Sequence, residues 1–355
     1  MNVTGSHEST NANGPPEQGA ESARKPRLTG IPLLIAALSV VLLVQAAFVL
    51  SYVGALHQPK PHRVSIGVVG ASPLPIAVGK QFSLRITRYP SEAAASGAID
   101  ERKIDGAFVV DSTGAKLIVA PAASPSLASA LGGAFAAAGA AFGQKIAIVQ
   151  VHTLPAGDAG GSVSFLVVMA LIVGGYLAAT IGMAFGGRAK RPRRLVSLAI
   201  AAVVGALLTD TIAGPVLGAV PTSKFLALWG IFTLIMMAVA FAAAALQAAL
   251  GAAGTLVVVV LFVIFGAPAS GGTVPTAFLP WFWRTFGPYL PAGAGTTVVR
   301  NTIYFSANDI ARSLLILAAY LVVGALAVIA IRNEKSESTG VAEAEASAAA
   351  AGAIV

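Results

Sequence analysis

The chain has 355 residues, of which 56% are apolar and only 11% charged, and this composition excludes a soluble globular protein. The formal net charge of +8 comes from basic residues that cluster beside uncharged apolar runs, so it indicates membrane orientation and no nucleic-acid partner. Cysteine is absent, which excludes disulfides and Cys-ligated metals, and the four His lack metal-ligand spacing. We therefore expect no metal and no cofactor.

The amino-terminal part of the chain predicts a cytoplasmic tail followed by one membrane helix. Residues 1–27 are polar and rich in Gly, Pro, Ser and Asn, so they cannot bury a core and we expect a disordered tail. Residues 28–56 are almost purely apolar and uncharged, which is enough for one spanning helix. A cleaved signal peptide would have a shorter apolar region and a small-residue cleavage site, so we expect a retained anchor.

Residues 57–160 have the mixed pattern of a small α/β domain. The expected strands are 62–68, 84–88, 107–110, 116–119 and 146–151, and the expected helices include 92–103 and 126–142. The tetrapeptide Asp111-Ser112-Thr113-Gly114, between the third and fourth strands, is a hairpin signal. The order β-α-β-α-β-β-α-β predicts an extracytoplasmic α/β domain inserted between the first and second membrane helices.

Residues 161–332 predict a membrane domain of five further helices, which makes the fold an α-helical polytopic membrane protein with six spans. The expected spans are 163–185, 195–213, two helices within 225–267, and 310–331. The run 225–267 is too long for one helix, and we place its break near 247–254, where glycines permit a tight turn. Ser306 and Asp309 have capping-box spacing at the start of the last span. Residues 333–355 predict a second disordered cytoplasmic tail, of low complexity.

Six spans place both termini on one side of the membrane, and the basic residues indicate which side. With both termini in the cytoplasm, ten Lys and Arg flank the spans on the inner side, and four lie in the short outer segments. Cytoplasmic loops carry an excess of Lys and Arg, so we expect this orientation in the plasma membrane.

The stretch 266–305 interrupts the pattern of continuous helices, and we call it the broken segment. It lies between two apolar runs, yet it is crowded with Pro and Gly, which interrupt helices. Aromatic residues recur at short spacings that place one aromatic face on a short helix; they are Phe278, Trp281, Phe282, Phe286 and Tyr289. We expect a re-entrant or interfacial element over the helix bundle, and the alternative is an aromatic-rich surface loop. The candidate gating residues are Pro268, Ser270, Gly271, Gly272, Pro275, Pro280, Trp281, Trp283, Pro288, Pro291, Gly293 and Arg300.

Asp210 is the only acidic residue well inside a predicted span. A carboxylate near bilayer depth is costly and indicates a functional site, here with a substrate- or proton-linked role. The structural alternative is a position near the outer end of its helix, where Thr209 or Thr211 caps the carboxylate or where it reaches the interface.

The loop between the second and third predicted spans is strongly basic. It contains Arg188, Lys190, Arg191, Arg193 and Arg194. Such a loop determines topology. Alternatively, it is a docking surface for a cytoplasmic partner or for anionic lipid headgroups.

Motifs of nucleotide binding and catalysis are absent from the sequence. There is no G-x-x-x-x-G-K-[ST] loop, so any ATPase that energises this chain is a separate subunit. HExxH, GxSxG and a GxGxxG after a strand are also absent, and no acid/base or nucleophile constellation can be named. We therefore expect no enzyme activity in this chain.

Two stretches carry a resemblance to a known family. One is Phe265-Gly266-Ala267-Pro268-Ala269-Ser270-Gly271-Gly272 with Pro275, Leu279-Pro280, Phe282-Trp283, Pro288, Leu290-Pro291, Gly293, Arg300 and Tyr304-Phe305. The other runs from Glu92-Ala93 to Ile99 and continues with Asp105-Gly106-Ala107-Phe108-Val109-Val110. With one amino-terminal span, an outer domain and five more spans, the chain resembles the ABC-2 type membrane (permease) superfamily, in particular its YhgE/Pip-like branch.

The resemblance implies a permease subunit of an exporter-like system that acts as a homodimer in the lipid bilayer. In ABC-2 systems a separate ATP-binding subunit docks on the cytoplasmic loop between the second and third spans, which here is Arg188 to Arg194. Some branch members are phage-infection or secretion-accessory proteins. The alternative function is therefore a non-energised receptor or scaffold that binds a partner through its outer domain.

Overall fold

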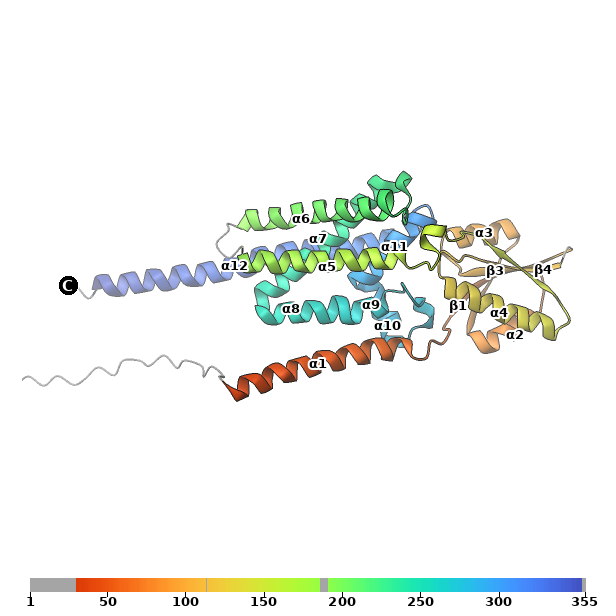
Figure 1. Ribbon diagram of the computed structural model, residues 1–355, viewed down its shortest axis with the longest axis horizontal. Coiled ribbons are helices and arrows are strands. Elements are labelled where there is room, and N and C mark those ends of the chain that lie inside the picture. The colour runs from red at the N-terminus through yellow and green to blue at the C-terminus, as the bar shows by residue number, and fades with distance from the viewer. Residues whose placement is uncertain (1–29, 113, 186–190, 353–355) are drawn as a thin grey trace, which may run out of the picture. The chain divides into compact units, whose positions relative to one another are not determined.

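The computed structural model describes residues 30–112, 114–185 and 191–352. In this part of the chain five helices are long and apolar enough to cross a membrane, as in a polytopic helical membrane protein. They are α1 (Ile31–Leu56), α5 (Val163–Phe185), α6 (Arg191–Thr211), α7 (Phe225–Leu250) and α12 (Ala311–Gly352) (Figure 1). The chain divides into residues 1–43 and 44–355, and the contacts described below lie within the second of these units.

Both predicted tails stay predictions. Residues 1–27 lie outside the described residues. α12 continues to Gly352, and alanine and glutamate, which favour helix, are frequent in 333–352.

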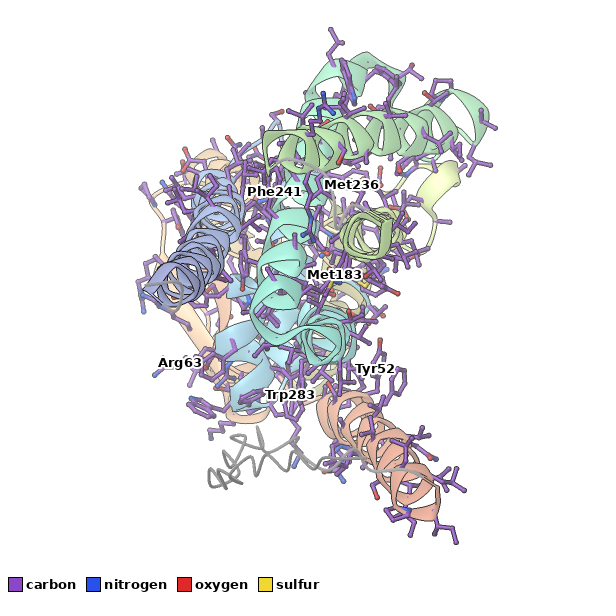
Figure 2. All side chains as sticks on the ribbon, turned by 90° about the vertical axis from the view of Figure 1, so that its left-hand side faces the viewer. Tyr52, Arg63, Met183, Met236, Phe241 and Trp283 are labelled. Atoms are coloured by element: carbon purple, nitrogen blue, oxygen red, sulfur yellow. The ribbon has the colours of Figure 1, made fainter. Side chains whose placement is uncertain are left out.

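Helix α7 lies at the centre of the helix bundle, because α5, α6 and α12 each pack against it (Figure 1). Small residues permit this close packing: Gly324 of α12 lies against the backbone of Phe241. The flexible side chain of Met236 lies against Gly174 of α5 and Gly205 of α6, between these helices (Figure 2). α7 therefore has neighbours on several sides, which agrees with its almost uniformly apolar sequence.

The long uncharged run 225–267 is divided at Gly251, within the predicted interval 247–254. Gly251 has a φ of +62°, a conformation that glycine adopts without steric cost. It is followed by α8 (Ala252–Val258), the π-helical turn η4 (Val259–Phe265) and α9 (Gly266–Ala269). This second apolar run is shorter than the five helices named above, so the count of six spans stays a prediction.

The predicted α/β domain is present, and its elements have the predicted order. They are β1 (Val64–Val69), α2 (Leu74–Phe82), β2 (Leu84–Arg88), α3 (Glu92–Asp100), β3 (Gly106–Asp111), β4 (Gly114–Val119), α4 (Pro125–Ala141) and β5 (Ile146–Gln150). The strand order in the sheet is β2-β1-β3-β4-β5, and neighbouring strands are parallel except for β3 and β4. The pairing of Asp111 with Gly114 confirms the predicted hairpin. The side of the membrane on which this sheet domain lies stays a prediction.

Apolar side chains form a core on each face of the sheet. On the face covered by α2 and α4, Phe108 of β3 stacks on Phe135 of α4, with ring centroids 5.1 Å apart. On the other face, Ile99 of α3 packs with Val109 and Ile118. Successive residues of a strand point to opposite faces, so the neighbours Phe108 and Val109 enter different cores.

Two phenylalanines from the carboxy-terminal half of the chain complete these cores. Phe278 is 9% exposed and packs into the core beneath α2 and α4. Phe305 is 1% exposed and packs into the core beneath α3, where its ring centroid lies 4.6 Å from that of His152. The sheet domain is therefore joined to the broken segment through its cores, in addition to the linkers at its two ends.

The predicted capping box at Ser306 and Asp309 is wrong. α12 begins at Ala311, so Ser306 lies too far upstream to cap its first turn. Ser306, Ala307 and Asp309 have φ values of 52°, 62° and 54°, whereas a capping residue has an extended backbone. Arg63, before the first strand, also has a positive φ, of 52°, which is not an extended conformation. β1 therefore begins at Val64, two residues later than the predicted start at residue 62.

Candidate functional site

After α9, the broken segment is a series of short helices, each with a proline at or next to its first residue. They are η5 (Thr276–Phe278), α10 (Trp281–Phe286), η6 (Gly287–Tyr289) and α11 (Pro291–Tyr304). Pro275 and Pro280 stand immediately before η5 and α10, and Pro291 is the first residue of α11. Proline lacks an N–H that would have no partner in a first turn, and its φ suits a helix start. The predicted interruption is confirmed, and the prolines also start the helices that follow.

Glycines bring the parts of the broken segment into backbone contact. A Cβ atom at Gly287 would collide with the carbonyl oxygen of Ala269, and one at Gly293 would collide with the carbonyl oxygen of Gly287. Gly272 likewise lies against the ring of Phe165 in α5. Any larger residue at these positions forces backbone segments apart, so η6 and α11 depend on glycine for their packing against α9.

Arg300 of α11 is a buried cation around which the turn after α9 folds. Its side chain is only 8% exposed. Nη1 donates to the carbonyl oxygen of Gly271 at 3.0 Å, and Nη2 donates to those of Gly272 at 3.1 Å and Gly161 at 3.4 Å. Ser270 Oγ accepts from the backbone N–H of Gly272 at 3.1 Å. These glycine carbonyls lie outside regular helices, so Arg300 supplies the donors that a helix would otherwise provide.

Asp158 connects this site to the start of α5. Its side chain is buried, and Oδ1 accepts from the backbone N–H groups of Ser162 at 2.9 Å and Val163 at 3.0 Å. Oδ2 accepts from the Tyr304 hydroxyl at 2.6 Å. A carboxylate at a helix N-terminus satisfies amide groups that have no intrahelical partner. The sequence did not predict that Asp158 caps α5 or that Tyr304 bonds to it. The one local signal was that Asp158 is an acidic residue shortly before an apolar run.

The buried charges change the titration of their neighbours. Burial, and then the positive charge of Arg102, lower the pKa of Arg300 to about 10 against the opposing effect of Asp158. Burial and the hydrogen bond to Asp158 raise the pKa of Tyr304 well above its usual range. At neutral pH Arg300 is therefore charged, and Tyr304 is a neutral hydroxyl that donates to Asp158.

The aromatic residues of the broken segment do not form one face. Trp281, Phe282, Phe286 and Tyr289 are exposed, and the rings of Trp281 and Phe282 each contact that of Phe286 in an edge-to-face or tilted arrangement. Phe278 instead lies in a core of the sheet domain. The predicted single face is wrong at Phe278 because Pro280 stands between η5 and α10 and sets a new direction for the chain.

Trp283 joins α10 to the carboxy-terminal end of α1. Its Nε1 donates to Ser51 Oγ at 3.4 Å, and Ser51 Oγ donates to the carbonyl oxygen of Ile264 in η4 at 2.7 Å. Gly54 leaves room for the indole ring, since a Cβ there would lie 3.1 Å from it. Figure 2 labels Trp283 together with Tyr52 of α1. Trp283 therefore packs against another helix of the protein, whereas Trp281 is exposed.

Asp210 lies at the end of α6, directly before the π-helical turn η2 (Ile212–Val216). Its side chain is 1% exposed, and neither carboxylate oxygen makes a hydrogen bond of good geometry among the described residues, although the backbone N–H of Trp229 in α7 lies nearby. The hydroxyls of Thr209 and Thr211 donate to carbonyls of their own helix, those of Gly205 and Leu207. Asp210 therefore lies near the end of its helix, as the structural alternative expects, but neither threonine hydroxyl caps it. Its functional role and its contact with the membrane interface stay predictions.

Part of the basic loop lies outside the described residues, and the rest belongs to the first turn of α6. Arg188 and Lys190 are not described, α6 begins at Arg191, and Arg193 is exposed in its first turn. Arg194 is partly buried. Both interpretations of this loop, as a topology determinant and as a docking surface, stay predictions.

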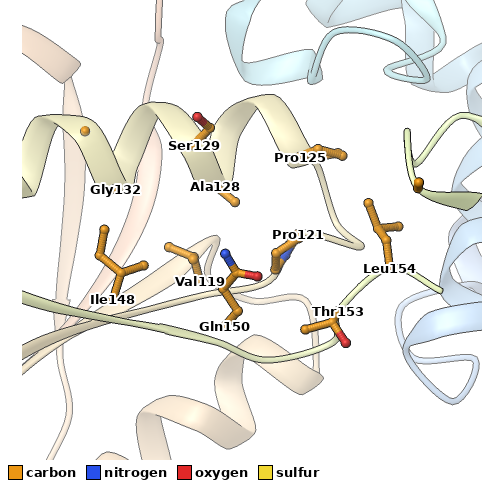
Figure 3. A pocket seen from close by; sticks show the side chains of 12 residues that line it. Val119, Pro121, Pro125, Ala128, Ser129, Gly132, Ile148, Gln150, Thr153 and Leu154 are labelled. Atoms are coloured by element: carbon orange, nitrogen blue, oxygen red, sulfur yellow. The ribbon is translucent and has the colours of Figure 1, made fainter. Parts of the chain in front are cut away.

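A groove of about 530 Å³ lies between α4 and β5 of the sheet domain (Figure 3). β5 is an edge strand, because it stands last in the sheet order. Ile148 of β5 is 45% exposed, and Gln150, Ser129 and Thr153 supply polar groups to the lining. A Cβ at Gly133 of α4 would meet no atom within 4 Å, so the groove is open there. The Ala-rich sequence predicts the helix α4, but it does not predict the groove between α4 and β5.

Comparisons of the chain with protein-family models, with curated proteins and with solved structures found no match. Among the described residues no group of three or more His, Cys, Asp or Glu is arranged to hold a metal ion. The functional argument therefore rests on three features of this chain: the broken segment, Asp210 and the groove.

We expect Tyr304→Phe to lower the free energy of unfolding by about 1–3 kcal/mol, because it leaves the buried Asp158 Oδ2 without its donor. Tyr289→Phe is the matched control, since Tyr289 is 50% exposed and its hydroxyl bonds to no residue that the structure describes. Thermal unfolding of the purified protein in detergent measures both variants. Equal stability of the two variants would contradict the role of Tyr304.

Proposed function

We propose that this chain is the membrane permease subunit of an ABC-2 type exporter-like system, which acts as a dimer in the plasma membrane with a separate ATPase. The observation that carries the proposal is the broken segment with its buried Arg300. A membrane anchor needs only continuous helices. Interrupted helices at membrane depth require cover by protein, and they are typical of proteins that move solutes.

In this proposal the apolar run Ala253–Ala269 is the sixth membrane helix. At 1.5 Å per residue it is roughly 26 Å long, which approaches the ~30 Å of the hydrocarbon core. Six crossings put both termini in the cytoplasm and the sheet domain outside. The excess of basic residues between α5 and α6 supports this orientation.

The broken segment is the part that we propose to move during transport. Gly287 and Gly293 pack η6 and α11 against α9 without intervening side chains, so these parts move together. Phe278 and Phe305 extend from this unit into the sheet domain. A shift of α9 and α11 within the bundle is thereby transmitted to the outer domain, which would guide the release of substrate.

The energy source in this proposal is a separate ATP-binding subunit that docks on the basic loop. Two observations support it: the chain contains no phosphate-binding loop, and the loop contains Arg188, Lys190, Arg191, Arg193 and Arg194. Basic side chains can pair with acidic groups of a protein partner at the membrane surface.

We expect a nucleotide-binding subunit to co-purify with the chain from native membranes. Changing the five basic residues of the loop to Gln should remove that subunit, because the docking charges are lost. The location of a carboxy-terminal tag, read by protease protection, controls for an altered topology. Failure to recover any nucleotide-binding subunit with the unmodified chain would contradict the proposal.

Asp210 is the group that we propose to couple proton or substrate movement to the bundle. It is buried, it makes no hydrogen bond of good geometry among the described residues, and it precedes the π-helical turn η2. A buried acid without a structural partner lowers stability, so we infer that its benefit is functional. π-helical turns are frequent at functional sites.

We expect Asp210→Asn to leave membrane insertion and thermal stability unchanged or improved, because no hydrogen bond of good geometry is lost. ATP hydrolysis by the co-purified complex should fall by about tenfold or more, as expected for a lost proton-transfer group. Thr211→Val in the same helix is the control. If Asp210→Asn retains full hydrolysis and full cellular function, Asp210 has no transport role.

A second candidate function is a non-energised receptor or scaffold, and the groove between α4 and β5 favours it. The groove follows an edge strand, whose free backbone groups can pair with an extended segment of a partner. Under this alternative the membrane helices only anchor the sheet domain, and changes in the broken segment would leave binding intact.

The alternative predicts that Gly133→Leu, which fills the groove, abolishes capture of the external partner from intact cells by cross-linking. Gly97→Leu in α3 is the matched control, because a Cβ there also meets no atom within 4 Å but lies outside the groove. A loss in Gly133→Leu alone supports the scaffold. Identical capture by both variants contradicts it.

A further inference from the structure

A small cavity of about 110 Å³ lies between the sheet domain and the broken segment. Its lining includes Arg102 and Ser124 from the sheet domain, Thr276 from the broken segment, and Thr297 and Arg300 from α11. On the same measure a site for one water molecule has a volume of roughly 10–15 Å³, so the cavity accommodates a small polar group of several heavy atoms. Polar side chains from both parts of the molecule therefore converge on one small space.

Arg102 brings unused hydrogen-bond donors to this cavity. Its Nε is fully buried, and the side chain donates to no residue that the structure describes. The guanidinium lies over the ring of Phe305, 4.6 Å from the ring centroid, which fixes its plane. A buried N–H without an acceptor costs about 1–3 kcal/mol, so this position favours an acceptor that enters from outside the chain.

The nearby carboxylates do not fill that need. Asp105 and Asp309 both lie near enough to Arg102 to act on it electrostatically, but neither forms an ion pair with it. Asp105 lines the cavity, but its Oδ2 accepts from the backbone N–H of Ser65 at 2.9 Å, and burial raises its pKa. Asp158 is engaged with the start of α5 and with Tyr304. No ion pair joins Arg102 or Arg300 to a carboxylate among the described residues, where the ion pairs involve other basic groups.

We propose that this cavity binds a phosphate group through Arg102, with Arg300 supplying positive charge and the hydroxyls of Ser124, Thr276 and Thr297 supplying further donors. Arg is the residue best suited to phosphate, because its planar fork matches two phosphate oxygens. Hydroxyls on other sides of the cavity suit the remaining oxygens. The site goes beyond the proposed transport function and does not depend on it.

A phosphate in this position would join the sheet domain to α11. The phosphate would bind Arg102 of the sheet domain and approach Arg300 of α11. Binding would therefore stabilise the contact between the sheet domain and α11. The group could come from free inorganic phosphate or from the headgroup of a phospholipid at the membrane surface. Both sources present the same oxygens, and the two arms of the experiment separate them.

The first arm measures thermal unfolding of the full chain, purified in detergent without phospholipid, as inorganic phosphate is titrated at constant ionic strength with chloride. We expect the melting temperature to rise with phosphate in the unmodified protein. Arg102→Gln should weaken the apparent affinity by about tenfold or more, and Arg102→Lys should retain part of it, because Lys keeps the charge but loses the fork. Arg85→Gln, an exposed arginine on β2, is the control for charge and should behave as the unmodified protein.

The second arm repeats the titration in nanodiscs of phosphatidylglycerol and in nanodiscs of a phosphate-free glycolipid. If inorganic phosphate no longer raises the melting temperature in phosphatidylglycerol nanodiscs but still does so in the glycolipid, and if phosphatidylglycerol stabilises the unmodified protein more than Arg102→Gln, the site binds lipid headgroups. A response kept in both lipids assigns it to free phosphate. Equal responses of Arg102→Gln, Arg85→Gln and the unmodified protein, or no response in either arm, would overturn the proposal.

Discussion

The need to satisfy irregular backbone inside an apolar protein is the constraint on which the rest of this structure depends. Where the helices break between α9 and α11, carbonyl groups lose their intrahelical partners, and a largely apolar chain offers few donors. Arg300 answers this need with one planar group that bonds three glycine carbonyls. Glycine at these positions has a separate steric reason, because a Cβ at Gly272 would collide with the ring of Phe165, and Gly161 and Gly271 have φ values of +65° and +71°.

The two buried charges of the carboxy-terminal half have opposite surroundings. Arg300 is fully engaged, and Asp158 and Tyr304 complete its environment, so its desolvation is offset by hydrogen bonds. Asp210 is buried without a hydrogen bond of good geometry among the described residues. The first arrangement supplies hydrogen bonds to its buried groups, whereas the second leaves a buried carboxyl group without one, and its role is the one proposed above.

Features that depend on local periodicity could be predicted from the sequence, and features that depend on distant contacts could not. Helix α5, the break near Gly251 and the element order of the sheet domain follow from apolar runs, glycine and alternation along the chain. The bond between Asp158 and Tyr304 and the packing of Phe278 into the sheet domain join residues far apart in sequence. Local signals exist, an acidic residue before an apolar run and Pro280 after Phe278, but they do not identify the distant partner. The capping box failed because spacing alone does not say where a helix begins.

The insertion of Phe278 and Phe305 into the sheet domain has a consequence for biosynthesis. The strands and helices of this domain end at Gln150, yet each of its two cores contains a ring that leaves the ribosome only much later. Such long-range contacts delay the final step of folding. The two cores of the sheet domain can therefore be completed only after Phe305, which precedes α12, has been synthesised, so folding of this domain is coupled to synthesis of the broken segment.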